Sequence, residues 1–565
     1  MLLELRGEDR NSVVNFQNAA RVIAAVAPND MPGALDADLG IDAAIVPVLR
    51  ELFEDNGSSL LELLQEDTPE GLLEMLLVPG LGPAKVRSIH EGLNVDTIQD
   101  LELATRDGRL AALPRFGEKT AEKIRKGIAD LRASGAPMLW QHANNIAERL
   151  QRVLSSRPEV ARVAIAGSIR RCSETVRDID IVVAVNGSPS VVAAMLANEL
   201  PGAHDTIGGG GRTVAVRLDD GVRLDLACVR PEQFALAEWR ATGSNSHVRE
   251  VINHALSAGY TIAADELRDA RGAILPVISE ADFFRQIGLA YIEPELREDS
   301  GEVEAARLHQ MPKLVSVQDI VGAVHCHSQY SDGGATIVDM ANAAIALGWK
   351  YLGISDHSQS NTYAGGLARE AILKQHEEIA GVNAAFVRDG VDFRILQGIE
   401  ADILPCGRVD YDAQFLDRFD FVIASIHSRY GMDERQMTER VLKSLDDPHV
   451  TILGHPTGRL LLTREPYAID MNAVIEKAGA VGVAIELNAD PHRIDIDWQM
   501  CKLAKTHGTM VSIGPDAHSP QGLQNIALGI ATARKGWLEA TDIVNSRSAD
   551  SVLEFARARR IPAIH

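Results

Sequence analysis

The sequence predicts a chain of several domains: helical at the start, mixed α+β in the middle and α/β at the end. Apolar residues recur at helical spacing in residues 1–75, and short β-rich runs alternate with helices from about residue 160. Seven apolar runs separated by helical stretches follow residue 318. The 565 residues also exceed one core, since a domain holds roughly 100–200. We expect the seven runs to be the strands of an α/β barrel.

Composition limits the cellular locations that are possible for the protein. No segment approaches the ~20 uninterrupted apolar residues of a membrane span, and the N-terminus lacks the basic-then-apolar order of a secretion signal. The five cysteines are scattered without a CxxC pair, which is typical of a reducing compartment. We therefore expect a cytoplasmic monomer that makes no membrane contact.

Charge is distributed unevenly along the chain. The net charge of −23 alone would argue against nucleic-acid binding, because phosphate contacts need Lys and Arg. Residues 1–75 hold fifteen Asp or Glu, four Arg and no Lys, whereas residues 76–135 hold eight acidic and ten basic residues. Any DNA contact in the first half of the chain is therefore expected in the second of these stretches.

The acidic residues 1–75 are predicted to form a helical N-terminal domain. Helical spacing is clearest over residues 13–23 and continues over 45–53 and 60–64.

Two similar glycine turns occur in residues 76–138. Gly80 and Gly82 precede Lys85, and Gly117 precedes Lys119. A tight turn that opens a helix exposes backbone N–H groups, which suit a phosphate. The two turns resemble helix-hairpin-helix motifs, which bind DNA without reading its sequence. The alternative is a pair of ordinary turns beside a solvated basic face.

Three carboxylates on two predicted strands suggest a metal site in residues 139–231. Asp178 and Asp180 are two apart on an extended segment, so they point to the same face. Two carboxylates on one face can hold a pair of divalent ions for phosphoryl transfer, and Asp225 on a later strand can supply a third. An exposed strand is the alternative for Asp-x-Asp alone, but a Gly-Ser-x-Arg-Arg turn precedes it.

The segment 167–180 resembles the palm signature of family X DNA polymerases, a branch of the nucleotidyltransferase fold. The likeness covers roughly residues 76–300 and includes the turn Thr242-Gly243-Ser244 and the segment 294–298 of a thumb-like subdomain at 232–300. It implies two Mg²⁺ or Mn²⁺ on the three aspartates, with Arg223 supporting the carboxylates. It implies a triphosphate held by Gly167, Ser168 and Arg171, and a sugar pocket at the Thr-Gly-Ser turn. DNA, gapped or primer-template, and dNTPs are the implied partners.

The nucleotide pocket departs from the pattern of that family. Arg240 and Ala241 stand where the family usually has Tyr-Phe, and Val248 stands where it usually has Asn. Trp239, one residue earlier, is expected to substitute in part for the missing aromatic contact. We expect a permissive pocket.

Residues 301–318 are polar and are expected to be a linker to a C-terminal domain at 319–565. The runs expected as strands are 321–324, 351–354, 394–397, 421–424, 451–453, 483–485 and 510–513. Six of the seven are followed at once by possible metal ligands: His325, His327, Asp332, His357, Glu400, His427, His455, Asp516 and His518. Loops after the strands of an α/β barrel converge on one pocket, so these side chains should meet.

Six imidazoles and three carboxylates suit two or three Mn²⁺, Zn²⁺ or Fe²⁺ ions. The pattern resembles the PHP family of phosphoesterases, and all nine ligand positions of that family are filled. Arg459 is expected to contact a phosphate. Glu486 and Asn488, after the remaining run, have no assigned function.

Three functions are compatible with these features. The first is a gap-filling repair polymerase with an attached 3′–5′ exonuclease or abasic-site endonuclease. The second is a nuclease whose altered palm only binds DNA. The third is a small-molecule phosphatase, against which the hairpins and the palm argue.

The N-terminal domain is expected to lack the lyase that many family X enzymes carry. That chemistry needs a lysine amine, and the corresponding segment 39–46 has none. The first lysine of the chain is Lys85.

Overall fold

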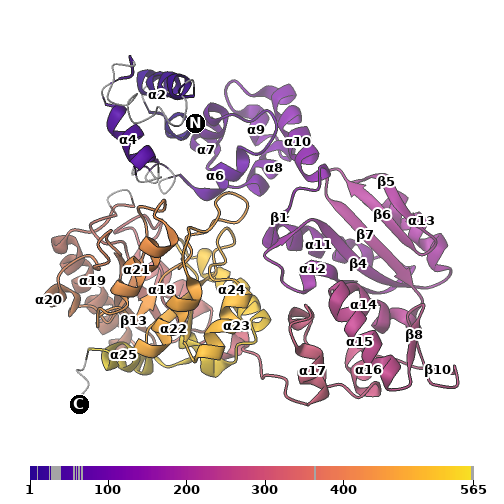
Figure 1. Ribbon diagram of the computed structural model, residues 1–565. Coiled ribbons are helices and arrows are strands. Elements are labelled where there is room, and N and C mark those ends of the chain that lie inside the picture. Colours follow the sequence, from indigo (N-terminus) through magenta and orange to yellow (C-terminus); the bar gives the residue numbers. More distant parts are fainter. Residues whose placement is uncertain are drawn as a thin grey trace. The chain divides into compact units, whose positions relative to one another are not determined.

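The computed structural model describes the chain apart from residues 9, 25, 27–39, 43, 55–57, 59, 62–63, 65–67, 362–363 and 561–565. The chain divides into two compact units (Figure 1). One comprises Met1–Leu76, Gly82–Asp96 and Leu314–His565, and the other Leu77–Leu81 and Thr97–Lys313. Among the described residues, no helix is both long and apolar enough to cross a membrane.

The regular structure described in the first 93 residues is helical, as expected. The helices are α1 (Leu2–Arg6), α2 (Arg10–Ile23), α4 (Val46–Glu54), α6 (Glu70–Met75) and α7 (Pro83–Leu93). Helix α7 begins after Gly82, with Pro83 in its first turn, where a missing N–H costs nothing. Part of the expected helix at 60–64 and of the segment 39–46 lies outside the described residues.

A second group of helices consists of α8 (Ile98–Arg106), α9 (Arg109–Ala112) and α10 (Gly117–Ala133). Gly117 opens α10 with a φ of +60°, a conformation that glycine adopts without strain. Gly127, in the middle of α10, lies so close to the backbone of Pro79 that a Cβ there would overlap it.

A five-stranded sheet in the order β2-β4-β7-β6-β5 forms the middle of the chain. Its strands are β2 (Val160–Ile165), β4 (Asp178–Val185), β5 (Ala203–Gly210), β6 (Thr213–Leu218) and β7 (Arg223–Val229). Helices α11 (Trp140–Ser155) and α13 (Pro189–Glu199) share one apolar cluster with the sheet. Helix α14 (Phe234–Thr242) contributes to a separate, smaller cluster with Val182 and Ala184. Neighbouring residues of β4 alternate between the two clusters, so the helices cover opposite faces of the sheet.

A thumb-like subdomain follows the sheet. It contains α15 (Asn245–Ser257), α16 (Glu280–Gln286) and a three-stranded sheet of β8 (Thr261–Ala263), β9 (Glu266–Arg268) and β10 (Ile274–Leu275). Helix α17 (Glu302–Arg307) also packs here: Glu302 is fully buried and pairs with His247 at 2.7 Å. The linker expected at 301–318 is therefore wrong for residues 302–307, because a buried hydrogen bond between Glu302 and His247 fixes this polar segment.

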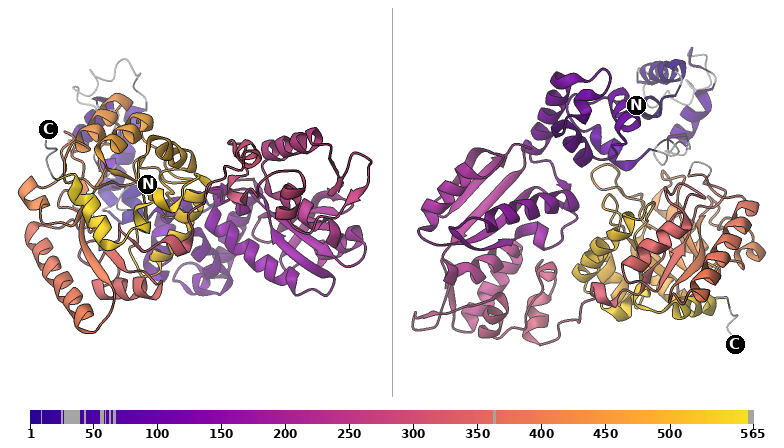
Figure 2. Two further views of the ribbon diagram at one scale, coloured as in Figure 1. Left: turned by 90° about the horizontal axis from the view of Figure 1, so that it is seen from below. Right: turned by 180° about the vertical axis from the view of Figure 1, so that it is seen from behind.

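The C-terminal domain is a parallel sheet of seven strands in sequence order. In Figure 2 it is the part of the ribbon coloured from salmon to yellow. The strands are β11 (Gly322–Ala323), β12 (Tyr351–Ile354), β13 (Arg394–Asp402), β14 (Phe421–Ser425), β15 (Ile452–Leu453), β16 (Ala484–Asn488) and β17 (Val511–Gly514). The chain segments that continue the two edge strands meet, since the His327 N–H donates to the Ala517 carbonyl at 2.9 Å. The barrel is nearly closed, and each expected run overlaps one strand, although β13, β14, β16 and β17 end later than expected.

The helices of the barrel lie between its strands in sequence. The longer ones are α18 (Ile337–Ala346), α19 (Arg369–Arg388), α21 (Glu434–Ser444), α22 (Met471–Val481), α23 (Trp498–His507), α24 (Ile526–Lys535) and α25 (Ala549–Ala558). Strands buried on both faces read as continuous apolar runs, which explains why the sequence predicted them well.

Candidate active sites

The palm carboxylates lie on two adjacent parallel strands. Strands β4 and β7 pair in register, with Asp180 opposite Asp225 and Asp178 opposite Arg223. Register partners on parallel strands share a face, so the three carboxylates project to the same side of the sheet. Arg223 donates from Nε and Nη2 to the two oxygens of Asp225, at 2.8 and 2.9 Å.

The environment of Asp180 disfavours its charged form. Burial, together with the negative charges of Asp178 and Asp225, raises the pKa of Asp180 to about 7, while Arg171 and Arg223 partly oppose the rise. Carboxylates crowded in this way gain from a bound divalent cation, which neutralises them. The donor set therefore fits hard cations such as Mg²⁺ or Mn²⁺.

The short helix α12 (Gly167–Arg170) lies against Asp180. Gly167 has a φ of +60°, and a Cβ there would overlap the Asp180 carboxylate. Glycine at this position thus lets the turn approach the carboxylate. Ser168 is half-buried, and its hydroxyl makes no hydrogen bond to any described residue.

Two consecutive arginines connect α12 to the thumb-like subdomain. Arg171 donates to Glu298 at 2.9 Å and to the Thr242 carbonyl at 2.8 Å. Arg170 contacts the Thr242 hydroxyl at 2.8 Å and both oxygens of Glu280 at 2.9 and 2.7 Å. In this structure the Arg171 side chain, expected at a triphosphate, lies in an ion pair with the thumb.

The turn expected at the sugar pocket joins two helices. Thr242 is fully buried, and Gly243 lies so close to His247 that a Cβ would overlap its ring. The Ser244 hydroxyl accepts a hydrogen bond from the His247 N–H at 3.1 Å and so caps α15.

Trp239 does not take the place expected for it. Its side chain is fully buried, 4.7 Å from the Phe283 ring, and its indole N–H donates to His247 at 3.3 Å. It packs inside the subdomain and presents no exposed face to a nucleotide, so the expected substitution for the missing aromatic is wrong. The neighbouring Arg240 pairs with Asp265 at 3.0 Å.

The hairpin glycines lie where helices begin. Gly80 has a φ of +89°, Gly82 precedes α7, and Lys85 is exposed in its first turn. Gly117 begins α10, and Lys119 is exposed in the first turn of that helix.

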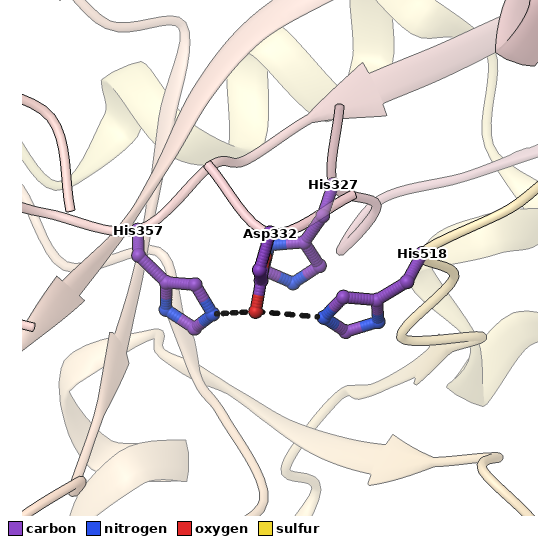
Figure 3. Close-up of side chains that lie close together, drawn as sticks. All are labelled: His327, Asp332, His357 and His518. Carbon is purple, nitrogen blue, oxygen red and sulfur yellow. Dashed lines mark ion pairs between the residues drawn. The ribbon is translucent and has the colours of Figure 1, made fainter. Parts of the chain in front are cut away.

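The nine expected barrel ligands come together in four overlapping groups. Within each group, possible ligand atoms lie within 4.8 Å of one another. The groups are His327-Asp332-His357-His518, His325-His455-Asp516, His325-His327-Glu400 and His357-Glu400-His427. Figure 3 shows the first group, in which an oxygen of Asp332 lies 3.3 Å from both His357 and His518.

Glu400 is the common member of the barrel site. One or other of its oxygens lies 2.9 Å from His357, 2.9 Å from His455 and 3.3 Å from His427. Despite burial, the facing His325, His357 and His427 hold the pKa of Glu400 well below its usual range.

Facing carboxylates and burial shift the pKa values of the imidazoles in opposite directions. Burial is outweighed by facing carboxylates at His427 and His518, whose pKa values rise to about 10 and about 9. Burial lowers the pKa of His455 to about 4. The same site therefore holds imidazoles whose pKa values are shifted both upward and downward.

Two further observations fit metal ions at this site. Buried polar atoms of His325, His327, Glu400 and His455 have no hydrogen-bond partner, and such atoms are costly unless something binds them. His325, His455 and Asp516 have φ values of 69°, 23° and 48°, a strained conformation that clusters at functional sites.

A layer of polar residues holds the ligands in place. Glu486 contacts His325 Nδ1 and accepts from the His455 N–H at 2.7 Å. The Asn488 amide donates to Asp516 at 2.9 Å, and Asp402 lies 2.8 Å from His427 Nδ1. Sequence reasoning left Glu486 and Asn488 without a function and missed Asp402. The available signal was a polar residue within an otherwise apolar, buried strand.

Three family models match the chain. They are the SAM-like helix-hairpin-helix tandem over residues 72–130, the DNA polymerase beta thumb over 237–298 and the PHP domain over 323–489.

Relatives match it over very different lengths. A protein named DNA polymerase/3′-5′ exonuclease PolX from Bacillus subtilis (strain 168) is 35% identical over 562 residues, which cover 98% of this chain and 97% of the relative. A probable phosphatase from Syntrophotalea carbinolica is 27% identical over 248 residues, 41% of this chain and 94% of its own. A solved structure of Leishmania infantum polymerase beta, a ternary P/T complex, covers 41% of this chain and 99% of its own, with 17% identity and a TM-score of 0.26.

The fold and its two polar sites define the class of protein, a polymerase core of the nucleotidyltransferase type joined to a PHP barrel. Since the Bacillus relative matches nearly the whole chain, the class can be narrowed. The chain belongs to the PolX family, the family X DNA polymerases that carry a PHP domain.

Proposed function

We propose that this protein is a gap-filling, template-directed DNA polymerase with an attached PHP nuclease, which acts as a 3′–5′ exonuclease, an abasic-site endonuclease or both. The observation that carries the proposal is the match to a polymerase/exonuclease over 98% of the chain. The third hypothesis, a small-molecule phosphatase, accounts only for the barrel, because the phosphatase relative matches 41% of the chain.

In the palm, Asp178, Asp180 and Asp225 would hold two Mg²⁺ or Mn²⁺ ions. When bound, such ions neutralise the charge that develops on a triphosphate and on the attacking primer oxygen. The fork of Arg223 fixes the orientation of Asp225, and Asp180 must lose its proton before it can bind a cation. Ser168 and Arg171 would contact the triphosphate, which requires Arg171 to leave Glu298.

DNA would be held by the hairpins through the N–H groups after Gly80, Gly82 and Gly117, with Lys85 and Lys119 on the backbone phosphates. The exposure of both lysines at helix starts supports this. Deoxynucleoside triphosphates would be the second substrate. We further propose a monomer that acts in the cytoplasm, and the scattered cysteines without a CxxC pair support that location.

In the barrel, the nine ligands would hold two or three Mn²⁺, Zn²⁺ or Fe²⁺ ions. Such ions activate water at neutral pH and bind the oxygens of a phosphodiester. Glu486, Asp402 and Asn488 would hold the ligand side chains in position.

Primer extension on gapped DNA with Mg²⁺ or Mn²⁺ tests the polymerase. We expect extension by the wild type and none by the Asp178→Ala/Asp180→Ala double variant. The second candidate, a nuclease whose palm only binds DNA, is favoured by the nucleotide pocket, which has Arg240, Ala241 and a buried Trp239. It predicts gap binding without extension by the wild type.

A further inference from the structure

A cavity of about 270 Å³ lies beside the loop that follows β15 in the C-terminal domain. Thr457, Arg459, Arg464 and residues 460–462 of that loop line it, together with Met500 of α23. Thr457 is two residues beyond His455, so one wall of the cavity continues directly from the barrel site. The volume lies near the lower end of the roughly 300–1,000 Å³ typical of small-molecule pockets, room for about one nucleotide.

Arg464 is held rigidly at this cavity. Its Nε donates to the Gly458 carbonyl at 2.9 Å, and its guanidinium lies 4.7 Å from the centre of the Tyr430 ring. Tyr430 in turn stacks on Tyr467, with ring centres 5.7 Å apart. The two terminal nitrogens of Arg464 make no hydrogen bond to any described residue. A guanidinium fixed in this way is ready to bind two oxygens of one phosphate.

The cavity wall is tied to the barrel site through Arg459. Its Nε donates to the Arg493 carbonyl at 3.2 Å, and it also contacts the Ile494 carbonyl. Arg493 Nε lies 3.8 Å from an oxygen of Asp516, one of the nine barrel ligands. The wall that Arg459 forms is therefore linked through Arg493 to a residue of the barrel site.

The rest of the lining suits a nucleotide better than a bare phosphate ion. Leu460, Leu461 and Leu462 lie beside Met500 and Pro466 and offer apolar surface for a sugar and a base. Two acids also line the cavity. The Asp497 carboxylate accepts the Met500 N–H at 2.8 Å and caps α23, and Glu465 is exposed. Proteins that bind single strands combine positive charge with surfaces on which bases pack, and here aliphatic side chains provide that surface.

We propose that this cavity binds one nucleotide of the DNA strand next to the phosphodiester that the barrel cleaves. Arg464 contacts the backbone phosphate of that nucleotide, and the wall of residues 460–462 and Met500 contacts its sugar and base. The inference rests on the proposed nuclease function and deepens it, because it assigns a binding site for polynucleotide substrates.

Two substrates, each assayed with the full chain and Mn²⁺, distinguish DNA binding from phosphodiester hydrolysis. One is a single-stranded oligonucleotide, and the other is bis(p-nitrophenyl) phosphate, a diester without a nucleoside. Arg464→Ala removes the phosphate contact, and Met500→Trp fills the cavity. We expect each to raise KM for the oligonucleotide roughly tenfold and to leave hydrolysis of the small diester unchanged. Arg388→Ala, at an arginine whose side chain is 71% exposed at the end of α19, is the matched control and should change neither.

Unchanged KM for the oligonucleotide in both variants would overturn the cavity assignment but not the proposed nuclease function. Equal loss of both activities would also overturn it, since the residues would then support the metal site. A wild type that hydrolyses the small diester but no oligonucleotide contradicts the nuclease function itself.

Discussion

At the scale of single residues, Glu486 shows how much the proposed metal ligands depend on their neighbours. It reaches two ligand residues from inside a buried strand, through His325 Nδ1 and the His455 N–H. Groups that orient metal ligands typically alter metal affinity about 10- to 100-fold when they are removed.

We expect Glu486→Gln to lower Mn²⁺ affinity of the barrel by about that factor, because the amide keeps the shape but loses the charge facing His325. Titration of the metal-free chain with Mn²⁺ measures the change. Glu476→Gln, at an exposed position of α22, is the control. Equal affinities for Glu486→Gln and wild type would remove Glu486 from the list of positioning residues.

Because the pKa of Asp180 is raised, we expect the metal-free protein to lose stability as the pH rises. The folded pKa of Asp180, about 7, lies above the unfolded value of roughly 3.9. The folded state therefore holds the proton more tightly, and stability is lost as pH rises from about 4 to about 7.

Asp180→Asn should remove this loss of stability. In EDTA we expect a gain in the free energy of unfolding on the order of 4 kcal/mol at pH 8 and of about 1 kcal/mol at pH 4.5. Thermal unfolding of the two proteins across this pH range gives the difference. Asp130→Asn, at an exposed position of α10, should show no such trend. An equal gain at both pH values would mean that the effect is not due to ionisation.

At the scale of elements, we expect polymerase activity to depend on the β4–β7 pair and nuclease activity to depend on the strands of the barrel. Replacing Asp225 with alanine takes a carboxylate from the β4–β7 pair, and we expect it to abolish extension while nuclease activity remains. His325→Ala or Asp516→Ala should do the reverse, because each removes a barrel ligand. Extension and degradation assays on the same preparations decide this. Loss of both activities in one variant would contradict two independent sites.

The packing of α14 predicts a weakly selective nucleotide pocket. With Trp239 buried, the aromatic contact and the hydrogen bond missing at Ala241 and Val248 are each worth about 1–2 kcal/mol. We expect weak dNTP affinity and poor discrimination against ribonucleotides, and Ala241→Phe should improve both. Single-nucleotide incorporation kinetics test this. Tight, strongly deoxy-selective incorporation by the wild type would contradict it.

The sequence predicted the elements of the barrel better than those of the nucleotide pocket. Each barrel strand overlaps an apolar run of the sequence, so local pattern sufficed for the strands, although Glu400 lies inside β13 and not after it. The thumb contacts depend on pairs of residues that are far apart in the sequence. Glu280 binds Arg170, 110 positions away, and Glu302 is buried beside His247. No local pattern predicts such pairs. For this reason α17 was expected to be part of a linker and Trp239 to be part of the nucleotide pocket.

At the scale of the whole molecule, the distribution of charge predicts an absent activity. Residues 1–75 carry four Arg against fifteen acids, a balance that should repel a 5′-phosphate. No lysine precedes Lys85, and the segment 39–46 that corresponds to the lyase position of the family lies partly outside the described residues. The N-terminal domain is expected to be a spacer or a protein-contact module.

We therefore expect no covalent adduct on residues 1–75 when the chain is treated with borohydride and a 5′-deoxyribose-phosphate substrate. Mass spectrometry of tryptic peptides locates any adduct. An adduct within residues 1–75, other than at the terminal amine, would overturn the chemistry. One at Lys85 would overturn the domain assignment.

The two sites differ in their donor atoms, oxygen alone in the palm and mostly imidazole nitrogen in the barrel. Oxygen donors favour Mg²⁺, which is abundant in cells, whereas imidazoles favour scarcer transition metals. Under starvation for transition metals, the barrel should empty first while the palm keeps its ions. Nutrient supply would then set the balance between building DNA and trimming it, without any change in the amount of protein.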